Sequence, residues 1–216
     1  MKCSAPSQLT ALLQGWAGNV TLVLCEVGFN FEDFINFQVF QNPGQLAVLD
    51  AWRGAAQAID ASFALSGRID HLVVWAAPVS AAWLGALLSP SVRLAAVRVY
   101  ERGSTESSNV VAACPESLGE LQLESPRMTM LPESMGQLAA LMTLDLIDCR
   151  LLSGLPEPMG QLAALTTLYL NHCISLTALP ESVCQLAALT TLDLRECTSL
   201  TGLPESMGQL AALTTL

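Results

Sequence analysis

The sequence repeats one phrase with a fixed 24-residue period, and this period constrains the fold more than any other feature. Leu131, Leu155, Leu179 and Leu203 each open "LPE(S/P)" and recur at this constant interval. After each comes "(M/V)(G/C)QLAAL(M/T)TL", and the complete units continue as "DLIDCRLLSG", "YLNHCISLTA" and "DLRECTSLTG". The fixed positions reduce to LxxLxLxxCxxLxxLPxxxxxLxx. A period of this length indicates a solenoid, in which each unit packs against its neighbours.

Each unit contains two kinds of segment. "LTTLDLRE" alternates leucine with polar residues, which predicts a strand with one buried face. "PESMGQLAAL" begins with Pro and Glu, which are favoured near helix N-termini, so we expect a short helix or turn on the opposite side. About six buried leucines contribute roughly 1.5–3 kcal/mol each, while ordering a unit costs on the order of 1.5 kcal/mol per residue. A lone unit therefore does not fold, and stacking supplies the difference.

The fixed positions resemble the signature of the leucine-rich-repeat family, L-x-x-L-x-L-x-x-N/C-x-L. That signature is read on three sets of residues: Leu141, Leu144, Leu146 and Cys149; Leu165, Leu168, Leu170 and Cys173; Leu189, Leu192, Leu194 and Cys197. One departure is that the next leucine follows each Cys by three positions. The "LPxxxxxL" tail and the Cys resemble the intracellular repeats of plant disease-resistance receptors and their plant and algal relatives. The resemblance implies an α/β leucine-rich-repeat solenoid, with a curved parallel sheet on the concave side and short helices on the convex side.

The regular repeats cover residues 111–216, and the last one is incomplete. Residues 1–110 form an N-terminal α/β region for which two interpretations stay open. In the first, this region consists of degenerate repeats. "CPESLGELQL" (114–123) is a degenerate unit with Pro126 in the place of the Cys, and weaker LxxLxL echoes precede it at a similar spacing. The echoes are Leu94, Val97 and Val99; Ile69, Leu72 and Val74; and Leu46, Leu49 and Ala51.

In the second interpretation, residues 1–110 are a small α/β domain that caps the repeats. Buried strands would lie at 19–27, 70–77 and 92–100, with helices at 45–65 and 80–88 between them. This alternation is typical of parallel βαβ units. The Phe-rich segment 28–44 would then cover the first apolar layer. Such a region would be a catalytic or nucleotide-binding domain with appended repeats.

Charge and composition exclude several classes of partner. The chain carries 19 acidic and 9 basic side chains, a net charge of −10, so phosphate groups are repelled. We therefore expect neither nucleic acid nor an anionic membrane as partner. The start of the chain is a poor signal peptide, and the sequence has no apolar run long enough to span a membrane. The seven Cys residues follow no disulfide spacing, which predicts reduced thiols in a cytoplasmic protein.

Three cysteines recur at the repeat interval: Cys149, Cys173 and Cys197. Stacked coils would place them one above another, about a strand spacing of 5 Å apart. We expect a structural ladder in which each buried thiol meets the backbone of the adjacent coil. A metal site needs several converging ligands, and beyond "HC" at 172–173 no CxxC or close Cys/His set occurs. The sequence therefore predicts neither a metal nor a cofactor.

The sequence also predicts no catalytic residues. His71 and His172 are its two histidines, and neither has a visible nucleophile or carboxylate partner. His71 is expected at a strand edge, and His172 is expected to point outward from the concave face. None of the motifs GxGxxG, GxxxxGK(S/T), HExxH and GxSxG is present. We therefore do not expect an enzyme.

The exposed strand positions vary between units while the leucines and "QLAAL" stay fixed. They form three columns: Arg98, Gln122, Asp145, Tyr169, Asp193; Tyr100, Glu124, Ile147, Asn171, Arg195; and Glu101, Ser125, Asp148, His172, Glu196. The candidate binding residues are Asp145, Ile147, Asp148, Tyr169, Asn171, His172, Asp193, Arg195 and Glu196. A less charged centre flanked by acids suits a protein partner with a basic rim. The sequence therefore predicts a non-catalytic protein–protein interaction module, with a partner that it does not identify.

The resemblance also implies a context. Such repeats serve as the sensor arm of nucleotide-binding immune receptors in defence signalling, or as the substrate-recruiting arm of a ubiquitin ligase. Either role would require sequence outside this chain. Because the last unit stops inside a strand, we expect a fragment of a longer protein. If the chain exists as written, we expect self-association through the uncapped C-terminal end.

Overall fold

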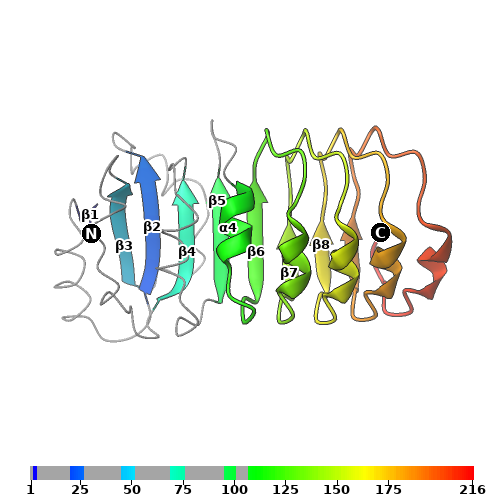
Figure 1. Ribbon diagram of the computed structural model, residues 1–216, viewed down its shortest axis with the longest axis horizontal. Coiled ribbons are helices and arrows are strands. Elements are labelled where there is room, and N and C mark those ends of the chain that lie inside the picture. Colours follow the sequence, from blue (N-terminus) through cyan, green and yellow to red (C-terminus); the bar gives the residue numbers. More distant parts are fainter. Residues whose placement is uncertain (1, 4–19, 27–44, 52–68, 76–94, 101–106) are drawn as a thin grey trace.

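The computed structural model describes residues 2–3, 20–26, 45–51, 69–75, 95–100 and 107–216. A single parallel sheet of nine strands runs through these residues (Figure 1). Its strands are β1 (Lys2–Cys3), β2 (Val20–Glu26), β3 (Gln45–Ala51), β4 (Ile69–Trp75), β5 (Ala96–Tyr100), β6 (Glu120–Glu124), β7 (Thr143–Asp145), β8 (Thr167–Tyr169) and β9 (Thr191–Asp193). Their order in the sheet is β1-β3-β2-β4-β5-β6-β7-β8-β9.

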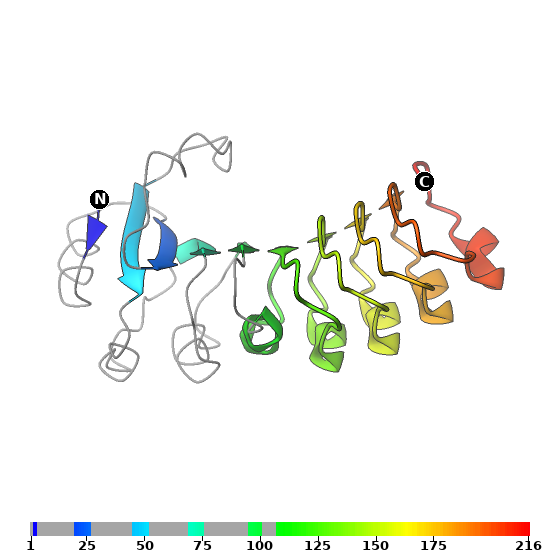
Figure 2. The same ribbon diagram turned by 90° about the horizontal axis from the view of Figure 1, so that it is seen from above.

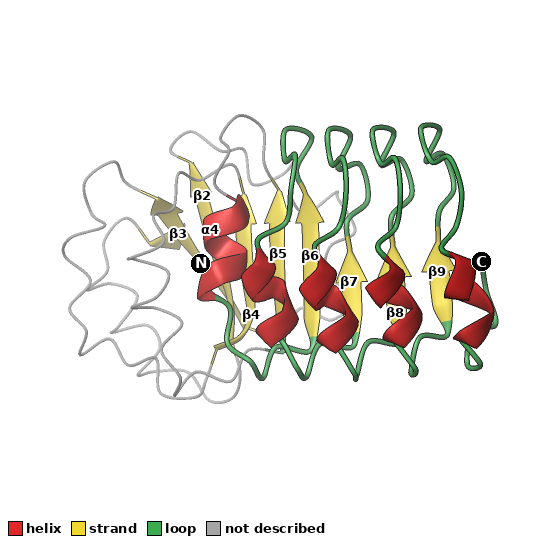
Figure 3. Cartoon of the chain, turned by 45° about the vertical axis from the view of Figure 1, so that its right-hand side comes forward, coloured by secondary structure: helices red, strands yellow, loops and turns green. Residues whose placement is uncertain are grey.

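Each complete repeat forms one strand and one short helix. The helix α4 (Ser107–Ala113) precedes β6, and the repeats then contribute the 3₁₀ helices η2 (Glu133–Gln137), η3 (Glu157–Gln161), η4 (Glu181–Gln185) and η5 (Glu205–Gln209). From β5 onward the helices lie on one side of the sheet, and Figure 2 shows the helices and the strands as two separate layers. Figure 3 shows the same alternation of helix and strand along the stack. The predicted solenoid with a parallel sheet and convex helices is therefore confirmed for the repeats.

Proline sets the start of each convex helix. Pro132 has extended backbone angles, φ −70° and ψ 150°, and Glu133 begins η2 immediately after it. The Met135 N–H donates to the Pro132 carbonyl and the Leu138 N–H donates to the Met135 carbonyl, both at 3.1 Å. Each bond links a residue to the third one before it, as expected for a 3₁₀ turn, which is usual in runs this short. The convex segment is thus a tight turn that returns the chain to the next strand within one repeat.

The core lies between the strands and the convex helices. The leucines of the repeat signature point into it, and Leu144, Leu146 and Leu168 have no exposed surface. From the helix side, Met135 and Met159 close the same layer without exposed surface. Each buried leucine contributes roughly 1.5–3 kcal/mol, so the stacked layers stabilise what a lone unit would not.

Two columns of hydroxyl side chains form hydrogen bonds between successive coils. Where each strand begins, Thr166, Thr190 and Thr214 donate to the carbonyl of the equivalent residue in the preceding coil, at 2.9, 2.9 and 3.0 Å. Beyond the strand, Ser153, Thr177 and Thr201 do the same, each at 3.2 Å. Because both columns link equivalent positions, they hold the coils in one register.

At two contacts between successive convex helices, η2 with η3 and η3 with η4, the helices approach so closely that only glycine fits. A Cβ added to Gly136 would lie 2.5 Å from the Pro158 carbonyl oxygen, and one added to Gly160 would lie 2.6 Å from the Ser182 carbonyl oxygen. Cβ atoms do not occur this close to backbone oxygens, so neither position accepts a side chain without movement of the neighbouring coil. In η4 the equivalent position is Cys184.

Strands β2 to β5 lie at predicted segments but in a different order, and β1 was not predicted. Strands β4 and β5 match both interpretations, β2 matches a strand of the second, and β3 matches an echo of the first, so the helix expected over 45–65 is wrong for Gln45–Ala51. Stacked repeats would place β3 between β2 and β4, whereas β2 pairs directly with β4. From β4 onward the strands follow in chain order. The expectations for 28–44 and 80–88 lie outside the described residues, and the division at residue 110 stays a prediction.

Candidate protein-binding surface

The concave face is the side of β5–β9 that lies opposite the helices (Figure 2). Strand pairing joins Arg98 to Gln122, Gln122 to Asp145, Asp145 to Tyr169 and Tyr169 to Asp193. Tyr100 and Glu124 are paired two positions further along the strands. These residues therefore lie in rows across the sheet, with neighbouring strands about 4.8 Å apart.

From the sequence, every residue of these columns is expected to be exposed, but several of them are half-buried or buried. Asp145, Ile147, Tyr169 and Asn171 are half-buried. Asp193 is buried, at 8% exposure, and so are Tyr100 and Ser125. The alternation of strand residues predicts all of these as exposed, but the hydrogen bonds and packing of neighbouring side chains cover three of them. The residue Glu101 lies outside the described residues.

The β5–β7 end of the face is acidic. Arg98 forms an ion pair with Glu120, with 2.6 Å between Nη2 and Oε1. The Tyr100 hydroxyl donates to Oε1 of Gln122 at 3.3 Å, and burial raises the pKa of Tyr100 to about 12. Burial, with the carboxylates of Glu120 and Glu124, also raises the pKa of Asp145 to about 6, against the opposing Ile147 N–H and Arg98. A half-buried carboxylate beside two others is a place where added positive charge is favoured.

Asp193 and Arg195 form a closed pair at the other end. Nε of Arg195 lies 2.9 Å from Oδ1 and 3.0 Å from Oδ2 of Asp193, and the backbone N–H of Arg195 donates to Oδ1 at 3.1 Å. These hydrogen bonds hold the pKa of Asp193 below its ordinary value. The Arg195 side chain itself is 80% exposed. Asp193 therefore orients Arg195, and the guanidinium is the part that a partner would meet.

The third predicted column lies in the turn beyond the strands. Asp148, His172 and Glu196 have φ angles of 60°, 64° and 60°. These values lie in the left-handed backbone region, which residues other than glycine seldom adopt. Because the strands end at Asp145, Tyr169 and Asp193, the strand alternation does not extend to these residues. The expectation that they continue the strand face is thus corrected to a column of turn residues. Asp148 also accepts hydrogen bonds from the exposed Arg150, at 3.1 and 3.2 Å.

The cysteine column lies beneath this turn. The thiols of Cys149, Cys173 and Cys197 donate to the carbonyl oxygens of Leu123, Leu146 and Leu170 in the preceding coil, at 3.2, 3.2 and 3.1 Å. All three side chains are buried and free of disulfides. Across the part of the chain that the structure describes, no group of three or more His, Cys, Asp or Glu side chains could hold a metal ion.

Each regular coil thus has a concave strand, a convex turn and a buried thiol bonded to the coil before it. Residues 111–216 form a leucine-rich-repeat solenoid. The leucines of the repeat signature pack in the interior, and the variable strand residues lie on the concave face and the adjoining turn. In the described segments, no helix is long and apolar enough to cross a membrane.

Comparison with known proteins gives a likeness of fold. No family model matches the chain, and no curated protein matches it. Among solved structures, the leucine-rich repeat domain of the type III effector XopL is 23% identical over 73% of this chain and 63% of that one, with a TM-score of 0.49. The Leptospira interrogans leucine-rich-repeat protein LIC12759 is 22% identical over 69% and 48%, with a TM-score of 0.35.

The plant peptide hormone receptor RGFR1, solved in complex with RGF2, is 17% identical over 100% of this chain and 41% of that one, with a TM-score of 0.30. This chain therefore spans less than two thirds of each of the three solved chains. Similarity at this level bears on neither function nor partner.

Strand alternation did not single out Glu120 as a residue of the face. Glu120 is paired with Thr143, and Thr167 and Thr191 continue its row. The regular units all have Thr at this strand position, whereas the degenerate unit has Glu120. This difference is the sequence signal that could have identified Glu120 as a residue of the face. Glu120 matters because it binds Arg98 and contributes to the raised pKa of Asp145.

Proposed function

We propose that this chain is a non-catalytic interaction module that binds a protein partner through the concave face of β5–β9. The observation that carries the proposal is the contrast between positions. Buried leucines and most convex residues recur from coil to coil, whereas the paired positions on the concave face are not constant: Asp145 and Asp193 share a residue type, but Gln122 and Tyr169 differ from them and from each other. A solenoid needs only its repeated positions to fold, so variation on one open face supports recognition there.

A random dodecapeptide library displayed on phage tests this proposal. Peptides selected on the immobilised chain are expected to bind the Tyr169→Ala variant at least tenfold more weakly. Gln161→Ala changes an exposed residue of η3 on the convex side and serves as the matched control. Selected peptides that bind Tyr169→Ala as tightly as the original chain, or no selection at all, would contradict the proposal.

As part of the same proposal, we place the module in the cytoplasm. Five cysteines in the repeat region are free thiols: Cys114, Cys149, Cys173, Cys184 and Cys197. Free thiols persist in a reducing compartment, which supports this location. Fluorescence imaging of the tagged gene product tests this location, and a cytoplasmic signal is expected. A signal confined to an oxidising compartment would contradict it.

The strand order favours one alternative function, a small-molecule site among the N-terminal strands β1–β4. β2 has β3 on one side and β4 on the other, so the order reverses at β2. In open parallel sheets, ligands bind outside the carboxyl ends of the strands at such a reversal. Thermal unfolding with ATP, GTP or NAD tests the alternative: a saturable rise in melting temperature supports it, and no rise with any of them contradicts it.

A further inference from the structure

We infer that the concave face binds an extended segment of its partner that places a lysine or arginine side chain over β6 and β7 and an apolar side chain, two positions away, over Ile147 and Tyr169. This inference rests on the proposed function and adds the chemistry of the partner. Its basis is the distribution of charge, burial and spacing across the face.

Carboxylates gather at the β5–β7 end of the face, where Glu120, Glu124 and Asp145 lie on the strands. Arg98 on β5 is bonded to Glu120, at 2.6 Å, rather than to Asp145. At the opposite end of the described face, the guanidinium of Arg195 is held by Asp193 on β9. A cationic partner side chain would therefore be attracted to β6 and β7 rather than to the opposite end.

Asp145 provides a specific acceptor for that cation. Its Oδ1 accepts the Ile147 N–H at 3.0 Å, which fixes the orientation of the carboxylate. Among the described residues, no hydrogen bond to Oδ2 is present. Because the carboxylate is half-buried, an ion pair formed there would be screened less by solvent than one on an open surface. An oriented, partly desolvated carboxylate distinguishes this position from the exposed acids on the convex side.

An uncharged surface lies directly beside it. Tyr169 is the strand partner of Asp145, and Ile147 follows Asp145 by two positions. Both side chains are half-buried and present apolar area beside the acidic end. Tyrosine combines a large apolar contact area with low conformational entropy, which suits it to binding surfaces. This surface would accept an apolar partner side chain.

The spacing between the two regions matches an extended chain. The centre of the acidic end and the centre of the Ile147–Tyr169 surface lie about one strand apart across the sheet and about one residue along it, or about 6 Å. In an extended peptide, alternate side chains point the same way and are about 6.6 Å apart. A basic residue and an apolar residue at positions i and i+2 would therefore reach both regions together.

The peptides selected from the phage library are the probe for this inference. Those that require Tyr169 are expected to carry Lys or Arg two positions from an apolar residue. Replacing that basic residue with Glu should raise the Kd at least tenfold. Asp145→Asn, which keeps an oxygen for the Ile147 N–H, should raise the Kd about fivefold and reduce the effect of the peptide substitution. Thermal unfolding verifies that the variant folds.

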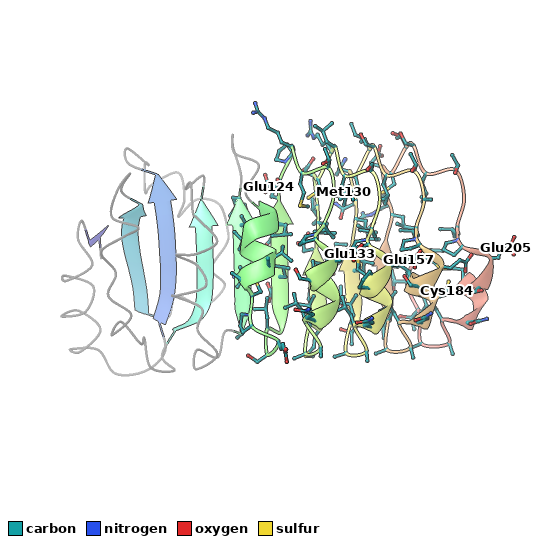
Figure 4. The ribbon with its side chains drawn as sticks, in the orientation of Figure 1. Glu124, Met130, Glu133, Glu157, Cys184 and Glu205 are labelled. Atoms are coloured by element: carbon teal, nitrogen blue, oxygen red, sulfur yellow. The ribbon has the colours of Figure 1, made fainter. Side chains whose placement is uncertain are left out.

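Glu157→Gln on η3 removes the same charge from the convex side (Figure 4) and should leave the Kd unchanged. An equal effect of Glu157→Gln and Asp145→Asn would show that net charge alone attracts the peptide, and would overturn the inference. Tyr169-dependent peptides without a basic residue would also overturn it, while the proposed function would stand. If the selected peptides do not depend on Tyr169, both this inference and the proposed function are contradicted.

Discussion

The thiol of Cys173 donates a hydrogen bond to the carbonyl oxygen of Leu146, 3.2 Å away in the preceding coil. The same carbonyl also accepts the Cys149 N–H within its own coil, at 3.2 Å. Burial raises the pKa of the Cys173 thiol, so the group stays neutral and keeps its proton as a donor. A small side chain with one weak donor thus joins two coils without introducing a charge into the core.

Removal of this thiol should destabilise the solenoid. Cys173→Ala deletes a hydrogen bond and leaves a small cavity in a fully buried site, and we expect a loss of about 2 kcal/mol in the free energy of unfolding. Urea denaturation followed by circular dichroism measures it. Cys197, in the last complete coil, is 9% exposed, so Cys197→Ala should cost less. Equal losses at both positions would argue against a role for burial.

The glycine positions of the convex helices offer a matched pair. Gly160→Ala would place a Cβ 2.6 Å from the Ser182 carbonyl oxygen, so η3 and η4 would have to separate. We expect a loss of about 1–3 kcal/mol, typical of overpacking. Gly208 occupies the same position in η5, where an added Cβ meets nothing within 4 Å. Gly208→Ala should therefore leave the melting temperature unchanged or raise it slightly, and destabilisation by both variants would refute the contact argument.

The left-handed turn predicts a stabilising substitution. His172 has a φ of 64°, a conformation that costs a non-glycine residue about 1 kcal/mol. His172→Gly removes this strain and should increase the free energy of unfolding by about 0.5 kcal/mol after the larger backbone entropy of glycine is included. Thr198→Gly, at an exposed turn residue outside the positive-φ set, should instead destabilise the protein. The two variants are compared by thermal unfolding, and a shift of the same sign in both would contradict the prediction.

Asp145 should make stability depend on pH. Its folded-state pKa is raised from 3.8 to about 6, so the folded protein binds a proton more tightly than the unfolded chain. The stability from this proton is fully present below about pH 4 and is lost as the pH rises through about 6. Asp145→Asn, which cannot ionise, should therefore be more stable than the original chain by about 1 kcal/mol at about pH 7.5, with part of the repulsion screened by solvent.

The measurement is a pair of denaturation curves at each pH. At about pH 4.5 the advantage of Asp145→Asn should be much smaller, because most of the Asp145 carboxyl in the folded protein is then protonated. Glu157→Gln on the exposed face of η3 is the control, and it should show no such difference. An advantage for Asp145→Asn that is independent of pH would rule out the electrostatic explanation.

Local patterns sufficed to predict the repeated part of the fold. The 24-residue period, the leucines at fixed positions and the proline before each helix are short-range signals that recur in every coil. They predicted the strands β7–β9, the convex helices and the rows in which Asp145, Tyr169 and Asp193 are paired. Strands β2 to β5 were predicted from the same kind of signal, but their order was not, because pairing of β2 with β4 is a contact between distant segments.

The sequence by itself determined that the chain stacks its repeated coils, since a unit too small to fold alone must bury its leucines against a neighbour. Only the tertiary structure decided which variable residues are open to a partner. Strand alternation treats Asp145 and Asp193 alike, yet Asp193 is buried beneath Arg195, whereas Asp145 lies half-buried among carboxylates. Exposure and charge at a position depend on side chains from adjacent coils, and those neighbours are defined only once the coils are stacked.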